Sequence, residues 1–357
     1  MRYRTLGSTG IQVSPYCLGA MMFGKWGNPD HDDSVRIINK ALDAGINFID
    51  TADVYSQGES EEIVGKALRT RRDSVVLATK VHGRMGESTE DPNRQGNSRR
   101  WITHEVDQSL RRLQTDYIDL YQVHRPDPRT GIAETLSVLS DLVRAGKVRA
   151  IGSSTFPAEA IVEAQWAAER CCLERFTCEQ PPYSLLARGI EASVLPTCDR
   201  YSMGVIAWSP LGGGWLTGRY RKDREIDMST GRASRIPARF DPGLPGNQQK
   251  LDVVEELITL ADKSGVSITH LAIAFVIAHP AVTSAIIGPR TMDQLDDLLA
   301  GAELSLDDDM LDQIDKIVPP GSTFNAADAG WEQPSIAQAW RRRRPPPLRA
   351  ASDGATA

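Results

Sequence analysis

The sequence predicts a (β/α)8 barrel, and two observations support this fold class. Eight short apolar runs rich in β-branched residues alternate with amphipathic stretches over most of the 357 residues. Seven of the runs begin at residues 46, 75, 117, 148, 176, 204 and 282, and all but the last interval match the length of a strand–helix–strand unit. Eight strands separated by helices in about 300 residues fit a closed barrel better than a doubly wound sheet.

The elements follow from these patterns in chain order. In the first helical stretch, residues 33–44, Val35, Ile38 and Leu42 fall on one face. The other predicted helices cover residues 61–68, 104–113, 133–143, 158–168 and 251–263. The predicted barrel strands cover residues 13–18, 46–50, 75–80, 117–122, 148–152, 176–180, 204–208 and 282–287.

Two additions to the repeat are expected. Residues 3–13 surround a Gly-rich turn and predict an N-terminal β-hairpin that closes the bottom of the barrel. The long interval after the seventh strand contains a Gly- and Arg-rich loop, residues 212–247, and loops of this length in a compact domain are usually functional lids or disordered. We expect one barrel domain over residues 1–318 and a C-terminal segment, 319–357, that is disordered at its end.

Composition indicates a soluble globular protein of the cytoplasm. Forty-one Lys and Arg face 47 Asp and Glu, a net charge of −6, and no apolar run approaches the 18 to 20 residues of a membrane span. No apolar region follows the basic N-terminus, so a secretory signal is not expected. The five cysteines have no C-x-x-C spacing and the six histidines form no H-E-x-x-H pattern, so we expect free thiols and no metal site.

The C-terminus is the basic part of an otherwise acidic chain. The last 17 residues carry five arginines, four of them at 341–344, against one aspartate. Such a run can bind nucleic acid or an anionic surface, or it can be a solvated tail. Because the acidic body would repel phosphate and no aromatic residues are interleaved, we favour the solvated tail and expect no nucleic-acid or membrane partner.

Four polar residues follow three consecutive predicted strands, where the active site of such a barrel lies. Asp50, Lys80 and His124 stand at or just beyond strand ends, and Tyr55 follows Asp50 by five residues. Each alone has an ordinary structural explanation, as a helix cap, a packed tyrosine, a surface lysine or a core histidine. Together they suit acid–base chemistry, because an ammonium favours a neighbouring phenolate, a carboxylate orients the ammonium, and a histidine can hydrogen-bond a substrate oxygen.

Several motifs around these residues resemble those of the aldo-keto reductase superfamily, in the family's order. The segment 50–55, Asp-Thr-Ala-Asp-Val-Tyr, and the segment 58–68 look like its signature. The resemblance covers residues 1 to about 318. Within the superfamily, the sequence resembles bacterial members and is also similar to potassium-channel β subunits. Further matching blocks are residues 78–81, 121–127, 151–154, 179–183, 208–211 and 287–290.

The resemblance implies hydride transfer from NADPH to the carbonyl carbon of a small aldehyde or ketone. The family's tetrad carries over to Asp50, Tyr55, Lys80 and His124, with Tyr55 as the proton donor. No G-x-G-x-x-G fingerprint follows a strand, so the cofactor is not expected on a Rossmann unit. The cofactor contacts that the resemblance implies are Asp50, Ser154, Gln180, Trp208, Ser209, Pro210, Leu211, Gly213, Arg219, Gly288, Arg290, Gln294 and Asp297.

Arg290 is the expected reason to prefer NADP over NAD, because a guanidinium suits the 2′-phosphate. Two positions depart from the common pattern, since Thr155 and Leu298 stand where many members have asparagine. The substrate pocket is expected to include Met22, Trp26, Trp101 and Trp331.

Two other functions remain open from the sequence. One is an NADP(H)-binding regulatory or redox-sensing subunit with little turnover, like the potassium-channel β subunits. The other is a hydrolase or isomerase that uses Asp50 and His124 and binds no nicotinamide. The natural carbonyl compound and the oligomeric state are not predicted.

Overall fold

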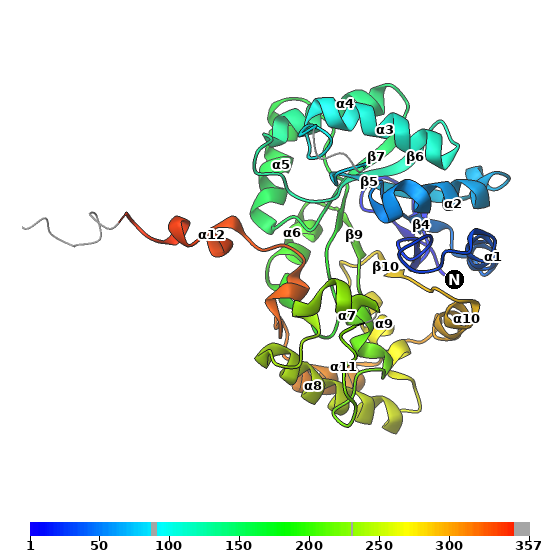
Figure 1. The fold of residues 1–357 in the computed structure, drawn as a ribbon, viewed down its shortest axis with the longest axis vertical. Coiled ribbons are helices and arrows are strands. Elements are labelled where there is room, and N and C mark those ends of the chain that lie inside the picture. Colours follow the sequence, from blue (N-terminus) through cyan, green and yellow to red (C-terminus); the bar gives the residue numbers. More distant parts are fainter. Residues whose placement is uncertain (87–90, 230, 346–357) are drawn as a thin grey trace, which may run out of the picture.

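A closed barrel of eight parallel strands forms the centre of the protein, as predicted. The computed structural model describes residues 1–86, 91–229 and 231–345, and Figure 1 shows helices surrounding the barrel strands. The strands neighbour one another in the order β10-β3-β4-β5-β6-β7-β8-β9. Their bounds are β3 Tyr16–Gly19, β4 Phe48–Asp50, β5 Val76–Val81, β6 Ile118–Val123, β7 Val148–Ser154, β8 Cys178–Gln180, β9 Gly204–Ala207 and β10 Ser284–Ile287.

The covering helices begin at identifiable signals. The Asp30 side chain accepts from the backbone N–H of Asp33 at the start of α1, and Ser98 caps α3 through the N–H of Trp101. Helix α8 starts six residues before the predicted position, because Pro245 occupies its first turn. The longer helices are α1 His31–Asp43, α2 Glu59–Leu68, α3 Arg99–Leu113, α4 Ile132–Arg144, α5 Ala158–Arg170, α6 Val194–Arg200, α8 Pro245–Lys263, α9 Ile268–Ala278, α10 Met292–Ala300 and α11 Asp308–Ile317.

The first predicted strand, residues 13–18, was wrong at its start. Val13 belongs to the hairpin strand β2, Gln12–Val13, which pairs with β1, Arg4–Thr5. The chain leaves the hairpin at Ser14, whose N–H donates to Asn47 Oδ1, and Pro15 has no N–H to continue a ladder. The barrel strand β3 therefore begins at Tyr16.

The hairpin fills the amino-terminal end of the barrel. Leu6 in its turn is fully buried and clusters with the interior side chains of the strands. Gly7 has φ +55° and lies so close to β9 that an added Cβ would stand 2.6 Å from the backbone nitrogen of Gly204. Only glycine fits such an approach, so the turn seals this end by direct backbone contact.

The loop after β9 is largely structured. It contains the 3₁₀ turns η4, Gly212–Thr217, and η5, Pro237–Arg239, and the short helix α7, Gly231–Arg235. This loop and the C-terminal segment are joined by a buried ion pair between Arg239 and Asp328, at 2.5 Å.

The chain packs on the barrel beyond the predicted domain boundary at residue 318, which itself stays a prediction. Thr323 bridges to Ala187, and the N–H of Arg188 donates to the carbonyl of Ser322. Figure 1 shows the helix α12, Pro334–Ala337, extending away from the barrel. Arg341–Arg344 are exposed, and the expected disordered end, residues 346–357, lies outside the described residues.

Within the described ranges, no single helix is long and apolar enough to cross a membrane. The pair α8 and α9 passes that test of length and composition together, but the two helices meet at a bend of 95°.

Candidate active site

The barrel interior has an apolar layer below a polar layer, and strand geometry explains both. Successive residues of a strand point to opposite faces, so residues two apart share the interior. Phe48 and Asp50 on β4 follow this rule, as do Ala78 and Lys80 on β5. The lower layer consists of Cys17, Phe48, Ala78, Leu120, Ala150, Cys178 and Ile206. The upper layer lies two residues further along each strand. Its members on six of the strands are Gly19, Asp50, Lys80, Gln122, Gln180 and Trp208.

Lys80 is the centre of the polar layer. Its fully buried ammonium donates to Asp50 Oδ1 at 2.5 Å, to the Thr51 carbonyl at 2.8 Å and to Tyr55 Oη at 3.4 Å. Burial alone would lower the pKa of Lys80, but Asp50 and Tyr55 outweigh it and raise the pKa. Lys80 is therefore held as a cation against the phenol oxygen.

Two glutamine side chains complete the surroundings of Asp50. Gln122 and Gln180 donate to Asp50 Oδ2 at 3.1 Å and 2.8 Å, and Gln180 also donates to Gln122 Oε1. Asp50 thus accepts three hydrogen bonds from different strands, which fixes its position beneath Lys80. Gln180 was predicted to hold a cofactor amide, and in this structure its amide nitrogen is engaged by Asp50.

His124 lies edge-on to Tyr55, with ring centroids 5.7 Å apart. Burial lowers the pKa of His124 far below its usual range, and the neighbouring charges of Lys80 and Arg125 lower it further. His124 is therefore a neutral imidazole beside the phenol, able to donate or accept one hydrogen bond. The structure brings all four predicted catalytic side chains to one end of the barrel.

Trp208 stands at the same end, between the barrel rim and the C-terminal segment. Gly330 approaches it so closely that an added Cβ would lie 2.6 Å from the indole and 3.1 Å from the methyl group of Thr155. The buried Nε1 of Trp208 has no hydrogen-bond partner among the described residues. Ser154 is buried nearby and donates to the carbonyl of Gln180 at 2.9 Å.

Several residues at this rim have left-handed backbone conformations that side chains rarely adopt. Ser56 and Gln57 follow Tyr55 with φ of 50° and 58°, and Thr155 and Ser209 have φ of 60° and 56°. Each such residue costs of the order of 1 kcal/mol, and such conformations concentrate at functional sites.

The turn η4 offers a cradle for phosphate groups. Gly213 and Gly214 have φ of 76° and 111°, so their backbone needs glycine. The Arg232 side chain lies against Gly213, and burial, followed by the charge of Arg239, lowers the pKa of Arg232 to about 10. Among the described residues no carboxylate pairs with Arg232. Ser209, Pro210 and Leu211 lead directly into this turn.

Arg219 reaches this turn through Tyr220, whose ring lies 3.7 Å from a Cβ added at Gly214. Its guanidinium is exposed and stacks on Tyr220, 5.6 Å from the ring centroid. Two arginines, Arg232 and Arg239, lie beside Gly213. The sequence reasoning missed both, because nothing periodic marks a position in a 36-residue loop.

The residues expected at the adenosine end cluster after β10. The N–H of Arg290 donates to Gln294 Oε1 at 2.8 Å, and its guanidinium is exposed. Nothing lies within 4 Å of a Cβ added at Gly288, so the space above it is open. The Asp297 carboxylate lies 3.3 Å from Nε2 of His270.

The four predicted substrate-pocket residues separate into two kinds. The Trp26 ring is 6.0 Å from that of Tyr55, and Trp331 follows Gly330 at the rim beside Trp208. Met22 is buried against Gly27, and Trp101 is buried on α3 and stacks on His104. Trp26 and Trp331 are both partly exposed, and Trp26 is the one whose ring is placed against a tetrad residue, Tyr55.

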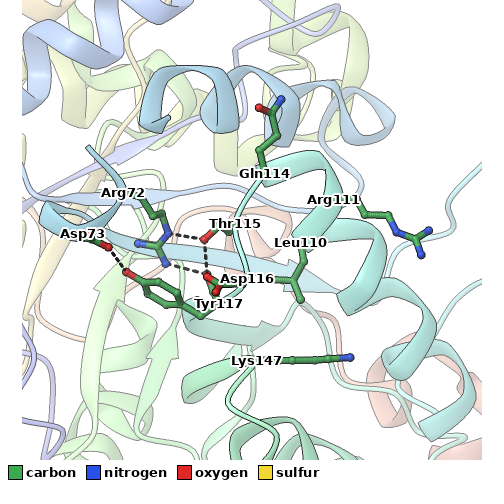
Figure 2. Close-up of a pocket in the computed structure, with 9 residues that line it drawn as sticks. All are labelled: Arg72, Asp73, Leu110, Arg111, Gln114, Thr115, Asp116, Tyr117 and Lys147. Atoms are coloured by element: carbon green, nitrogen blue, oxygen red, sulfur yellow. Dashed lines mark hydrogen bonds between the residues drawn. The ribbon is translucent and has the colours of Figure 1, made fainter. Parts of the chain in front are cut away.

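A shallow depression of about 680 Å³ lies at the opposite end of the barrel, where β6 begins. Figure 2 shows Arg72 and Tyr117 within it, and the Arg72 guanidinium stacks on Tyr117 and pairs with Asp119. Because these polar groups satisfy one another, the depression is explained by packing. Within the described ranges, no group of three or more His, Cys, Asp or Glu side chains is placed to hold a metal ion.

Comparisons with known proteins agree with this geometry. The model of the Aldo/keto reductase family matches residues 15–319. The Bacillus subtilis protein named uncharacterized oxidoreductase YrpG is 40% identical over 330 residues, which cover 90% of this chain and 97% of YrpG. Aldo-keto reductase YhdN of Bacillus subtilis is 39% identical, covering 84% and 88%. A probable voltage-gated potassium channel subunit beta of Arabidopsis thaliana is 34% identical, covering 89% and 97%.

Proposed function

Because this chain belongs to the aldo/keto reductase family, whose members generally use NAD(P)H, we propose that it reduces an aldehyde or ketone to an alcohol with NADPH and with Tyr55 as the proton donor. The observation that carries the proposal is the contact of Tyr55 Oη with the buried Lys80 ammonium, 3.4 Å away. Bound NADPH supplies the hydride to the carbonyl carbon. The chain supplies the proton and the electrostatic setting.

The four side chains have distinct roles in this proposal. Tyr55 gives its hydroxyl proton to the carbonyl oxygen as that oxygen gains electron density. Lys80 stabilises the phenolate that remains, and Asp50 holds Lys80 in place and charged. Neutral His124 hydrogen-bonds the substrate oxygen and orients it toward Tyr55.

The residues that would hold the cofactor fit it in shape and charge. The Gly213–Gly214 turn has the glycine-only backbone of an anion-binding loop, and Arg232 brings to it a positive charge that no carboxylate of the described residues pairs with. Trp208, with Ser154 and Gln180 nearby, would stack on the nicotinamide, and Arg290 with Gln294 and Asp297 would hold the 2′-phosphate and adenosine. We therefore propose Arg232 as a contact in addition to Arg219.

A second candidate is a regulatory subunit that binds NADP(H) with little turnover, since one relative is named as a probable potassium-channel β subunit. The intact tetrad favours the enzyme. Stopped-flow mixing of the NADPH-loaded protein with a panel of aldehydes separates the two. Rapid oxidation of the bound cofactor supports the reductase, whereas a tightly bound cofactor that no carbonyl oxidises supports the sensor.

A hydrolase or isomerase would not bind NADPH. Quenching of tryptophan fluorescence on addition of NADPH would therefore contradict the hydrolase or isomerase hypothesis. The domain division at residue 318 and the cytoplasmic location stay part of the proposal. Limited proteolysis, followed by mass spectrometry of the fragments, tests the boundary.

A further inference from the structure

We propose that Arg125 recognises a negatively charged group on the substrate, so that the preferred carbonyl compounds are aldehydes or ketones carrying a carboxylate. This inference rests on the proposed reductase function. It concerns a residue outside the tetrad and outside the expected cofactor contacts.

Arg125 is fixed at the catalytic end of the barrel. It follows His124 directly, and its Nη1 donates to the His124 carbonyl at 2.9 Å and to Thr155 Oγ1 at 2.7 Å. Its guanidinium carbon lies 5.9 Å from the centroid of the Trp208 ring. The side chain is thus held between the catalytic histidine and the indole proposed to face the nicotinamide.

The charge of Arg125 has no partner within the described residues. Arg125 forms no ion pair there, and its Nε and Nη2 groups make no hydrogen bond with them. Burial lowers its pKa, and the acidic groups that oppose this effect are Tyr55 and Glu179. An arginine that is partly withdrawn from water without a counter-ion is costly, and a bound anion removes that cost.

The charged groups that face Arg125 either bond to other groups or carry the same charge as Arg125. Glu179 accepts from Ser153 Oγ at 2.5 Å and from the N–H of Phe156 at 3.1 Å, and burial raises its pKa to about 7. Lys80 carries the same sign as Arg125 and is neutralised by Asp50.

The next carboxylate along the chain is also engaged. Asp127 accepts from the N–H of Asn97, from Thr130 Oγ1 and from Arg129. Within residues 1–86, 91–229 and 231–345, no carboxylate near Arg125 is therefore left over to balance its charge.

The phosphates of the proposed cofactor would not serve Arg125 either. Arg232 and Arg239 lie beside Gly213, and the charges of Arg239, Arg235 and Arg290 act on Arg232. Arg125 is instead bonded to Thr155 and His124 and lies 5.9 Å from the centroid of the Trp208 ring. The anion that complements Arg125 is accordingly one that arrives with the substrate.

A pair of aldehydes that differ in charge tests the inference. We would measure kcat/KM with NADPH for 4-carboxybenzaldehyde and for the neutral 4-formylbenzamide, in the unaltered protein and in Arg125→Gln. The ratio of kcat/KM for 4-carboxybenzaldehyde to kcat/KM for 4-formylbenzamide is expected to fall by about tenfold or more in Arg125→Gln. The main cause should be a higher KM for the carboxylate substrate. Intrinsic reactivity cancels, because the same two aldehydes are compared in both proteins.

Arg129→Gln is the matched control, since Arg129 lies four residues further along the same segment with its side chain 70% exposed. This variant should keep the ratio of the unaltered protein. Arg125→Lys should keep part of the preference, because a charge remains but the planar fork is lost. A ratio that is unchanged in Arg125→Gln overturns the inference.

A binding measurement separates this inference from the reductase proposal. Tryptophan fluorescence would follow titration with benzoate and with benzamide, without any aldehyde. Tighter binding of benzoate that is lost in Arg125→Gln supports the anion site even if no aldehyde is reduced, in which case the proposed function fails alone. Turnover of 4-formylbenzamide together with equal binding of benzoate and benzamide overturns the anion site alone.

Discussion

The ammonium of Lys80 donates to Asp50 Oδ1 across 2.5 Å at a depth where neither side chain is more than 3% exposed. Each charge is tolerable there because the other is present, and the same contact keeps Lys80 beside Tyr55. In the proposed reductase, stability and catalysis would thus depend on the same ion pair.

Removing one partner of that pair should destabilise the fold. Lys80→Met leaves the buried Asp50 carboxylate without its counter-ion, so we expect the free energy of unfolding to fall by about 3–5 kcal/mol in urea titrations. The double variant Asp50→Asn, Lys80→Met removes both charges and should recover more than half of the loss. Lys147→Met, which breaks the exposed pair with Asp107, should cost less than about 1 kcal/mol. A double variant as unstable as Lys80→Met would contradict this account.

Tyr55→Phe should abolish reduction while leaving the cofactor bound. The hydroxyl acts on the transferred proton, so kcat is expected to fall by about 10²- to 10⁴-fold. The dissociation constant for NADPH, measured by fluorescence titration, should change less than about twofold. Tyr117→Phe, at the opposite end of the barrel, is the control and should keep kcat. Substantial activity in Tyr55→Phe would rule out the assigned proton donor.

Arg290→Ala should weaken NADPH selectively. A guanidinium can bind the 2′-phosphate through two parallel hydrogen bonds, and NADH has no such group. We expect the dissociation constant for NADPH to rise about tenfold or more and that for NADH to rise less than about twofold. Arg36→Ala, an exposed arginine paired with Asp33, should alter neither value. Equal effects on both cofactors would refute the role of Arg290.

The C-terminal segment should affect Trp208 through one glycine. Gly330 and Gly321 both have φ +75°, so alanine at either position costs about 1 kcal/mol in backbone strain. A Cβ at Gly330 would meet Trp208 and Thr155, whereas nothing lies within 4 Å of one at Gly321. Gly330→Ala should therefore shift the tryptophan emission and weaken NADPH binding, and Gly321→Ala should do neither. Identical spectra for the two variants would show that the segment does not touch the site.

Glu179 should make stability depend on pH. Burial raises its pKa from 4.5 to about 7, so between these values the folded protein holds a proton that the unfolded chain has released. The free energy of unfolding should consequently decrease by about 3 kcal/mol as the pH rises from 4.5 to 7. Urea titrations at pH 5 and pH 7.5 should show this slope in the unaltered protein and in the exposed-residue control Glu174→Gln. The slope should flatten in Glu179→Gln, and a slope that persists there would assign it to another group.

Strand periodicity accounts for most of what the sequence could predict. Asp50, Lys80 and His124 were found because they end apolar runs, and Tyr55 because of its distance from Asp50. Gln122 obeys the same alternation, two residues before His124, so it could have been found. The error at Val13 had a visible signal as well, since Pro15 interrupts that run.

Other parts of the site depend on contacts between distant segments. Gly330 meets Trp208 across more than 100 residues, and Arg232 reaches Gly213 within a loop that has no repeating pattern. In the sequence, Arg125 appears only as one residue of the matching block 121–127. That it lacks a counter-ion becomes apparent only in the structure, where Glu179 and Asp127 are bonded to other groups. Whether a charged side chain has a counter-ion depends on the folded structure, so the sequence alone does not reveal it.

The hairpin seal also determines how protons reach the site. Leu6 and the apolar layer above it fill the barrel axis, so in the proposed mechanism the proton that Tyr55 gives away would be replaced from the end where substrate and product pass. Reprotonation and product release then share one route to water. Substitutions in the loops at that end should alter both rates together, whereas substitutions in the hairpin should alter stability alone.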